Sequence, residues 1–285
     1  MSNSESGLRA VSDAVCNCDP TQPRFIIETV YIAIMSNTSS PSSGRTAERT
    51  ETLSTGHTVE LPVRTRATML GATFAAPRAD VSELLPDRLR PIRATPTGAA
   101  AVTLLSVEYH EVAIPEMDPY DEFVVGVPAS HTSPSTVPYV SALTQATNGY
   151  VRYMPVTTEP ARAFGAEIWG FPKVVADITH DDDGSVRTTT VTVDGERFLT
   201  LAVDRPPSTR MTDDGFSYTV KDGRLLEVPN GIDAEVGGWP FTNDVSVSFG
   251  DHPEARPLDA LGLGPRALGR VSLDGTACFY PGRRV

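Results

Sequence analysis

Short apolar or alternating segments follow one another along the chain from residue 58 onward, separated by turn-forming residues. Segments of this length and period are typical of half-buried β-strands. They lie at residues 65–74, 100–109, 123–128, 151–156, 174–179, 186–193 and 198–203. The last three are separated by Asp183-Gly184 and Asp194-Gly195, dipeptides that favour the positive φ angles of tight hairpin turns. The pattern therefore predicts an antiparallel meander.

The Asp-Gly dipeptide recurs at Asp214-Gly215, Asp222-Gly223 and Asp274-Gly275. We interpret each of these as a further hairpin turn. The run of three aspartates at residues 181–183 lacks the spaced ligands of a calcium-binding loop, so we interpret it as a solvated turn.

Helical patterns are few. Asp80 followed by Glu83 is typical of a capping box, and it predicts a short helix that Pro86 ends. A second helix is predicted from Pro160, which suits a first helical position, to Trp169. Gly170 can then supply a left-handed cap, and Pro172 prevents the helix from continuing.

The N-terminal part of the chain has a different composition. Residues 1–55 are rich in Ser, Thr, Asn and Glu without a sustained period, and we predict that they form a disordered extension. Met35 directly precedes the most polar run, residues 36–52, so it is a possible alternative start of the protein. The folded domain is expected to span residues 56–285.

The charge of the chain excludes some partners. Its formal net charge is −12, which argues against nucleic acid and against an anionic membrane surface. Of the 24 basic residues, 22 are arginines and only Lys173 and Lys221 are lysines. An acidic, lysine-poor chain is typical of halophilic proteins, and a genome rich in G and C explains the arginines equally well.

Cysteine usage and hydropathy indicate a soluble protein of the reducing cytoplasm. Cys16, Cys18 and Cys278 form no disulfide framework, and no Cys/His cluster has zinc-ligand spacing. No apolar run approaches the ~20 residues of a membrane-spanning helix. Residues 25–35 are apolar but too few, and they lack the basic leader of a signal peptide.

Lys173 is the residue whose surroundings point to chemistry. A nucleophilic lysine must be uncharged, and desolvation of the ammonium can lower a lysine pKa by roughly 3–5 units. The apolar residues 168–172 and 174–176 flank Lys173 and supply such an environment. The alternative is a lysine at the start of a strand whose stem packs on Phe171 or Trp169 while its ammonium reaches water.

The segment around this lysine resembles the active-site segment of acetoacetate decarboxylases. The resemblance consists of Glu159-Pro160, Gly165, Glu167 and the run Gly170-Phe171-Pro172-Lys173, without a gap. Weaker similarities occur at Leu84-Leu85-Pro86, Tyr120-Asp121-Glu122, Val127-Pro128, Phe249, Asp251-His252 and Pro257-Leu258. The resemblance implies one α+β domain, mainly antiparallel strands curled into a cone or barrel around a pocket. It also implies a homo-oligomer that uses no metal or organic cofactor.

The resemblance further implies a decarboxylase in which Lys173 attacks the ketone of a β-keto acid and forms an imine. Glu122 matches the family's proton-handling glutamate; alternatively it is a surface residue of the acidic loop 116–122. Arg66 is the candidate for binding the substrate carboxylate, with Arg64 as a competitor. Phe171 and Trp169 are expected to line the substrate pocket.

Three further residues receive supporting roles. Glu167 is expected to orient the lysine segment, while His110 and His252 are expected to make hydrogen bonds without a catalytic duty.

Two departures from the family pattern leave the substrate open. Val174 occupies the place of a second lysine that follows the nucleophile in the decarboxylases. The family's second site glutamate aligns with Leu105, and Glu108 lies three residues further on. The alternatives are therefore an imine-forming aldolase–dehydratase of the same fold and a non-catalytic small-molecule binding relative.

Overall fold

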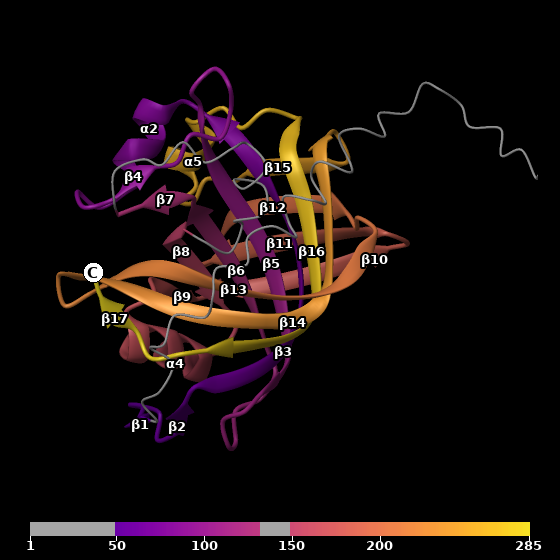
Figure 1. Ribbon diagram of the computed structural model, residues 1–285. Coiled ribbons are helices and arrows are strands. Elements are labelled where there is room, and N and C mark those ends of the chain that lie inside the picture. The colour runs from indigo at the N-terminus through magenta and orange to yellow at the C-terminus, as the bar shows by residue number, and fades with distance from the viewer. Residues whose placement is uncertain (1–48, 132–148) are drawn as a thin grey trace, which may run out of the picture. The chain divides into compact units, whose positions relative to one another are not determined.

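The computed structural model describes residues 49–131 and 149–285, which all belong to one unit of the chain, Thr38–Val285 (Figure 1). Three helices are described: α2 (Arg78–Glu83), α4 (Glu159–Trp169) and α5 (Arg256–Asp259). The strands are β1 (Arg49–Thr52), β2 (Thr58–Leu61), β3 (Val63–Ala76), β4 (Arg90–Pro91), β5 (Ala100–Val112), β6 (Tyr120–Val127), β7 (Ala129–Ser130), β8 (Gly149–Val156), β9 (Lys173–Val175), β10 (Asp177–Asp183), β11 (Val186–Val193), β12 (Glu196–Asp204), β13 (Ser208–Lys221), β14 (Arg224–Thr242), β15 (Val245–Phe249), β16 (Ala267–Phe279) and β17 (Arg283–Arg284).

The largest sheet curls into a barrel. Its strands follow the order β13-β14-β16-β3-β5-β6-β8-β9, with β17 paired to β14. β13 also pairs in parallel with β8, at Ser217 with Gly149 and Tyr218 with Tyr150, which closes the ring. Nearly all other pairings are antiparallel, so the predicted α+β, mainly antiparallel fold class is confirmed.

A second sheet, β10-β11-β12-β15, packs on the outside of this barrel. Two apolar cores result. The outer core joins alternate residues of β3, β5 and β6 to those of β11 and β12, and includes Phe74, Phe123 and Phe198. The inner core lies on the other face of the same barrel strands and is covered by α4, with Phe164 and Trp169 among its members. Because side chains alternate along a strand, β3, β5, β6 and β8 contribute residues to both cores.

The predicted meander is confirmed, with one interruption. β10, β11 and β12 form consecutive hairpins, with Asp194 at φ 52° and Gly195 at φ 79° in the second turn. The predicted strand at residues 174–179 is broken at Ala176, which separates β9 of the barrel from β10 of the outer sheet.

Two of the predicted turns were wrong. Asp222-Gly223 does join β13 to β14, but Asp214-Gly215 and Asp274-Gly275 lie inside the long strands β13 and β16. At Gly275 the reason is a close approach of strands, because a Cβ there would lie 2.5 Å from the Cα of Ala234.

Two predicted boundaries also need correction. Residues 49–55, assigned to the disordered extension, are part of the fold, because β1 pairs with β2 and Leu53 is buried. Residues 1–48 lie outside the described part of the chain. The first helix begins at Arg78 behind Pro77 and has no side-chain cap, so Asp80 and Glu83 lie within it rather than forming a capping box.

Among the described helices, none combines the length and the apolar character that a membrane crossing requires.

Candidate active site

Lys173 and Glu122 come from different strands of the barrel and point into the inner core. On β6, Phe123 and Val125 face the outer core, so Tyr120 and Glu122 face the inner one. β8 lies between the two residues, with its Val156 opposite Glu122 and its Met154 opposite Lys173. The sheet register therefore brings the amine and the carboxylate to one place.

The two side chains form a buried ion pair. Lys173 Nζ lies 2.7 Å from Glu122 Oε2, and the two side chains are only 4% and 5% exposed. Within residues 49–131 and 149–285, Oε2 makes no hydrogen bond of acceptable angle, so the contact is a charge pair without good alignment. Removing two charges from water costs more free energy than most folds recover, which makes such a pair a candidate for function.

Aromatic rings surround this pair. Nζ lies 5.3 Å from the centroid of the Tyr120 ring and 5.7 Å from that of Phe164, within the range of cation–π attraction. The Tyr109 hydroxyl donates a long hydrogen bond, 3.4 Å, to Glu122 Oε1, and its ring lies 4.6 Å from that of Tyr120. Burial, followed by the charge of Glu122, raises the pKa of Tyr109 well above its ordinary value. Burial likewise raises the pKa of Tyr120, so both phenols stay protonated.

The lysine stem passes directly beneath α4, at Gly165. A Cβ on Gly165 would lie 2.3 Å from Lys173 Cε and 2.6 Å from Cδ, closer than atoms approach. Gly165 is thus the residue that leaves room for the lysine side chain in the position that reaches Glu122.

The backbone before Lys173 follows from the predicted helix end. α4 begins behind Thr158, whose Oγ1 accepts a hydrogen bond from Ala161 N, and it has Pro160 in its first turn as predicted. It ends at Gly170, which adopts φ 76° and donates to Ala166 O. Pro172 then turns the chain, and Lys173 opens β9 beside Met154.

The other lysine of the chain anchors the same helix end. Lys221 Nζ donates to the backbone carbonyls of Glu167 and Ile168, at 3.1 Å for the latter. Such cations stabilise the negative end of a helix. Thr219 Oγ1 adds a 2.7 Å hydrogen bond to the carbonyl of Gly170. β13 therefore holds the segment that leads into Lys173.

The two aromatic residues predicted to line a substrate pocket are core residues in this structure. Trp169 is 2% exposed, donates its indole N–H to Tyr280 O at 3.0 Å, and packs on Phe164, Phe171 and Phe279. Phe171 is 7% exposed and belongs to the same cluster.

The predicted carboxylate-binding arginine lies away from the ion pair. Arg66 is half exposed, and its guanidinium lies 3.6 Å from Asp274 Oδ1 on the neighbouring strand β16. Arg64 is exposed as well. Alternation along β3 explains both positions, because Thr65 and Ala67 are the residues that turn inward. Neither arginine contacts Lys173 or Glu122 in the described part of the chain.

Glu108 and Glu167 make their contacts away from the ion pair. Glu108 faces away from Glu122 and accepts a hydrogen bond from buried Arg187 at 2.9 Å. The Glu167 carboxylate accepts hydrogen bonds from the amide and hydroxyl of Ser54, so it holds the segment after β1 rather than the lysine.

The two histidines make hydrogen bonds, as expected. His110 Nε2 lies 2.9 Å from Thr68 Oγ1, and His252 Nδ1 accepts from Glu254 N at 3.2 Å. Across the residues that the structure describes, no group of three His, Cys, Asp or Glu side chains is arranged to hold a metal ion.

Tyr109 is not among the residues that the sequence predicts for the site. The residue lies in a predicted strand of mostly apolar residues, where a tyrosine is unremarkable. Its role depends on the register of β5 with β6, which places Tyr109 opposite Tyr120 and two pairs away from Glu122, on the same face of the sheet.

A comparison with protein families identifies the family of this chain. The model of the family described as acetoacetate decarboxylase matches residues 50–221, more than half of the chain, including Glu122 and Lys173. The chain belongs to the acetoacetate decarboxylase family. A comparison of the sequence with curated proteins gives no significant match.

Solved structures of acetoacetate decarboxylases share the fold. The acetoacetate decarboxylase of Legionella pneumophila is 14% identical with a TM-score of 0.60, over 88% of this chain and 95% of that one. A second acetoacetate decarboxylase structure is 15% identical with a TM-score of 0.58, over 79% and 89%. The enduracididine biosynthesis enzyme MppR, complexed with the condensation product of pyruvate and imidazole 4-carboxaldehyde, is 13% identical with a TM-score of 0.57, over 78% and 88%.

Proposed function

We propose that this protein is an imine-forming lyase that decarboxylates acetoacetate or a related β-keto acid, with Lys173 as the nucleophile. The single observation that carries the proposal is the buried pair of Lys173 Nζ and Glu122 Oε2 at 2.7 Å. A buried lysine ammonium needs a nearby base to become the free amine, and the short distance to Glu122 supports this carboxylate as the proton acceptor.

The reaction follows from the chemistry of a cationic imine. The Lys173 amine adds to the ketone carbon, and water leaves to form a protonated imine. The bond to the carboxylate carbon then breaks, carbon dioxide departs, and the electron pair moves through the new double bond to the imine nitrogen. The resulting enamine takes a proton at carbon, and water hydrolyses the imine to a methyl ketone and free Lys173.

Glu122 and its neighbours handle the protons. Glu122 accepts a proton from Lys173 before attack and returns one to the enamine carbon, since its Oε2 has no aligned hydrogen bond to break first. Tyr109 keeps its own proton and holds Oε1, which directs Oε2 toward the amine. Tyr109 is thus a positioning residue.

An aldol-type condensation through the same imine is the second candidate. It is supported by the structural similarity to MppR and by Val174, which stands where the decarboxylases carry a second lysine. Val174 packs against the outer core, so it faces away from the amine. Release of carbon dioxide from acetoacetate separates the two candidates, because the aldol-type enzyme leaves acetoacetate intact.

Borohydride trapping tests the imine itself. The protein is incubated with acetoacetate and sodium borohydride, digested, and the modified peptide is identified by mass spectrometry. Because the chain has only two lysines, the assignment is simple. We expect a reduced adduct on Lys173 and none on Lys221, whose ammonium is held by two backbone carbonyls.

The matched variants are Lys173→Arg and Lys221→Arg. The first keeps the charge but offers no nucleophile at neutral pH, so it should lose both trapping and turnover while remaining folded. The second should keep both. Retained turnover in Lys173→Arg would refute the assignment, and the absence of any adduct in the unaltered protein would favour a non-catalytic binding protein.

A further inference from the structure

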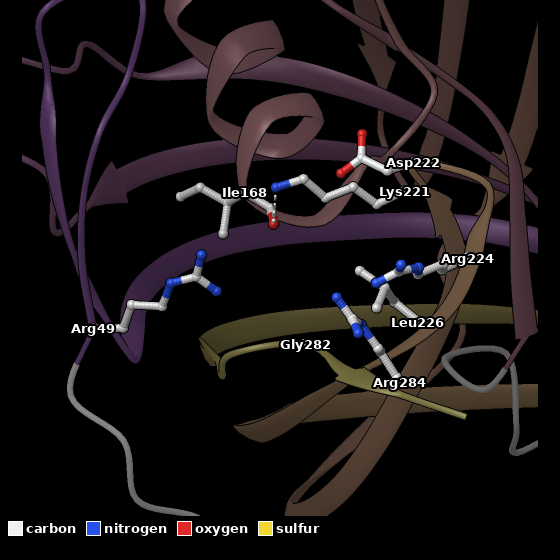
Figure 2. A pocket seen from close by; sticks show the side chains of 8 residues that line it. All are labelled: Arg49, Ile168, Lys221, Asp222, Arg224, Leu226, Gly282 and Arg284. Carbon is white, nitrogen blue, oxygen red and sulfur yellow. Dashed lines mark hydrogen bonds between the residues drawn. The ribbon is translucent and has the colours of Figure 1, made fainter.

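A cavity lies away from the lysine site, at the hairpin that joins β13 to β14. Its volume is about 240 Å³, and its lining includes neither Lys173 nor Glu122. The lining residues are Arg49, Ile168, Lys221, Asp222, Arg224, Leu226, Gly282 and Arg284 (Figure 2). Half of these eight residues are basic, in a chain whose net charge is −12.

The arginines reach the cavity from three separate strands. Arg49 belongs to β1, Arg224 to β14 and Arg284 to β17, and their guanidinium groups turn toward the same space (Figure 2). The one acidic lining residue, Asp222, points its carboxylate to the other side of Lys221 in this view (Figure 2). Among the lining residues, therefore, no acidic side chain lies between the three guanidinium groups in this view (Figure 2).

Two of these arginines lack a counter-ion. In the described part of the chain, neither Arg224 nor Arg284 has an ion pair, whereas the adjacent Arg283 binds Glu227 and Arg210 binds Asp233. Arg49 forms an ion pair with Glu51, two residues further along β1. Like charges that face one another repel, so a cluster of cations is usually neutralised by carboxylates of the same protein. This acidic chain has many carboxylates, yet among the described residues it leaves Arg224 and Arg284 without one. The cluster is therefore suited to bind an external anion.

The apolar lining residues and the volume of the cavity indicate the size and chemical class of the anion. Ile168 and Leu226 give the cavity an apolar wall beside the cationic one. A volume of about 240 Å³ is below the range typical of drug-sized ligands, roughly 300–1,000 Å³, so it suits a compact molecule. Guanidinium groups bind phosphate oxygens in a bidentate manner, and a phosphate has enough oxygens to be shared among several of them.

We propose that the cavity formed by Arg49, Arg224 and Arg284 binds a small phosphate-bearing molecule. Arg224 and Arg284 supply the forks that bind the phosphate, Arg49 closes the site from the opposite side, and Lys221 adds positive charge while remaining bound to the end of α4. This site is independent of the imine chemistry at Lys173.

The test is a calorimetric titration of the full chain with inorganic pyrophosphate at about 0.15 M salt, where exposed charges are screened. The variant Arg224→Gln/Arg284→Gln is compared with Arg210→Gln/Arg266→Gln, which removes two exposed arginines elsewhere and changes the net charge equally. Each lost hydrogen bond to a charged group weakens binding about tenfold, so we expect about a 100-fold loss in the first double variant and little change in the second.

Two results would overturn the proposal: no saturable binding to the unaltered protein, or an equal loss in both double variants. Melting temperatures of all three proteins show that the variants are folded. Lys173→Arg should bind pyrophosphate as the unaltered protein does, so the failure of the imine proposal and the failure of this one are distinguishable.

Discussion

At the scale of single residues, the central feature is a charge pair whose burial adds little to the stability of the fold. Lys173 and Glu122 compensate each other at 2.7 Å while both are almost fully removed from solvent. Breaking one partner of a buried pair leaves an uncompensated charge, which typically costs 3–5 kcal/mol, whereas replacing both partners is often neutral. If replacing both partners leaves the stability unchanged, the pair is not there to stabilise the fold.

The first prediction concerns this asymmetry. Glu122→Gln should lower the free energy of unfolding by about 3 kcal/mol at pH 7, because it leaves the Lys173 ammonium without its counter-charge. The double variant Glu122→Gln/Lys173→Met should recover most of that loss, since no buried charge remains. Urea unfolding curves give both values; a double variant less stable than the single one would contradict this account.

The second prediction concerns Tyr109. Tyr109→Phe removes the donor to Glu122 Oε1, so the rate of borohydride trapping should fall by about fivefold, corresponding to about 1 kcal/mol. Tyr153→Phe, in the outer core, is the control and should leave the trapping rate unchanged. Equal trapping rates in the two variants would remove Tyr109 from the site.

At the scale of elements, α4 does most to place the lysine. Its apolar face seals the inner core, its Gly165 accommodates the lysine stem, and its C-terminal cap turns the chain into β9. Lys221 and Thr219 of β13 fix that end. The helix thus supports the backbone segment that positions the Lys173 side chain.

The third prediction tests the close contact at Gly165. Gly165→Ala should raise helix propensity by about 1 kcal/mol, so stability should hold. The added methyl group must displace Lys173 Cε, and trapping should slow by on the order of 100-fold, as expected when a reacting group moves by about 1 Å. Gly238→Ala, where a Cβ meets nothing within 4 Å, serves as the control. Unchanged trapping in Gly165→Ala would show that the lysine reacts from another position.

The fourth prediction concerns the helix cap. Gly170 and Gly184 both adopt positive φ, 76° and 63°, so alanine at either costs about 1–2 kcal/mol of backbone strain. Only at Gly170 would the Cβ also collide, at 2.7 Å from Lys221 Cβ and 2.8 Å from Val220 O. Thermal unfolding should therefore show a clearly larger loss for Gly170→Ala than for Gly184→Ala. Equal losses would mean that β13 shifts to accommodate the added methyl group at little cost in free energy.

At the scale of the whole folded unit, several barrel strands contribute to two cores, one beneath the outer sheet and one beneath α4. The closure of the ring through β13 and β8 brings the C-terminal strands beside the lysine segment. One consequence is that two tyrosines lie deep in the inner core beside a carboxylate, where they resist ionisation.

The fifth prediction follows from these raised pKa values. In the unfolded chain Tyr109 and Tyr120 lose their protons near pH 10, while burial keeps both protonated in the folded state. Below about pH 10 both states hold these protons, and the free energy of unfolding does not depend on them. As the pH rises further, the free energy of unfolding falls by about 1.4 kcal/mol per pH unit for each tyrosine. The variant Tyr109→Phe/Tyr120→Phe should show a shallower decline of unfolding free energy between about pH 10 and 11. A slope identical to that of the unaltered protein would count against deep burial of these phenols.

The local pattern of the sequence predicted much of the fold. β11 begins and ends at the predicted residues 186–193, and the end of α4 at Trp169 and Gly170 was correct, because hairpin turns and helix caps depend on neighbouring residues. The turn predicted at Asp274-Gly275 was wrong because this glycine does not reflect its neighbours in sequence. It is required by the close approach of Ala234 on β14, a strand distant in sequence.

What the sequence determined by itself is the candidate residue and its local structure: a rare lysine behind a capped helix and a proline, in a segment that resembles a known family. Only the tertiary structure decided what that lysine meets. Glu122 reaches it across β8, Tyr109 joins through strand register, and Arg66 turns away because side chains alternate on β3. Local geometry is encoded within a few residues, whereas contacts between strands depend on how the whole barrel closes.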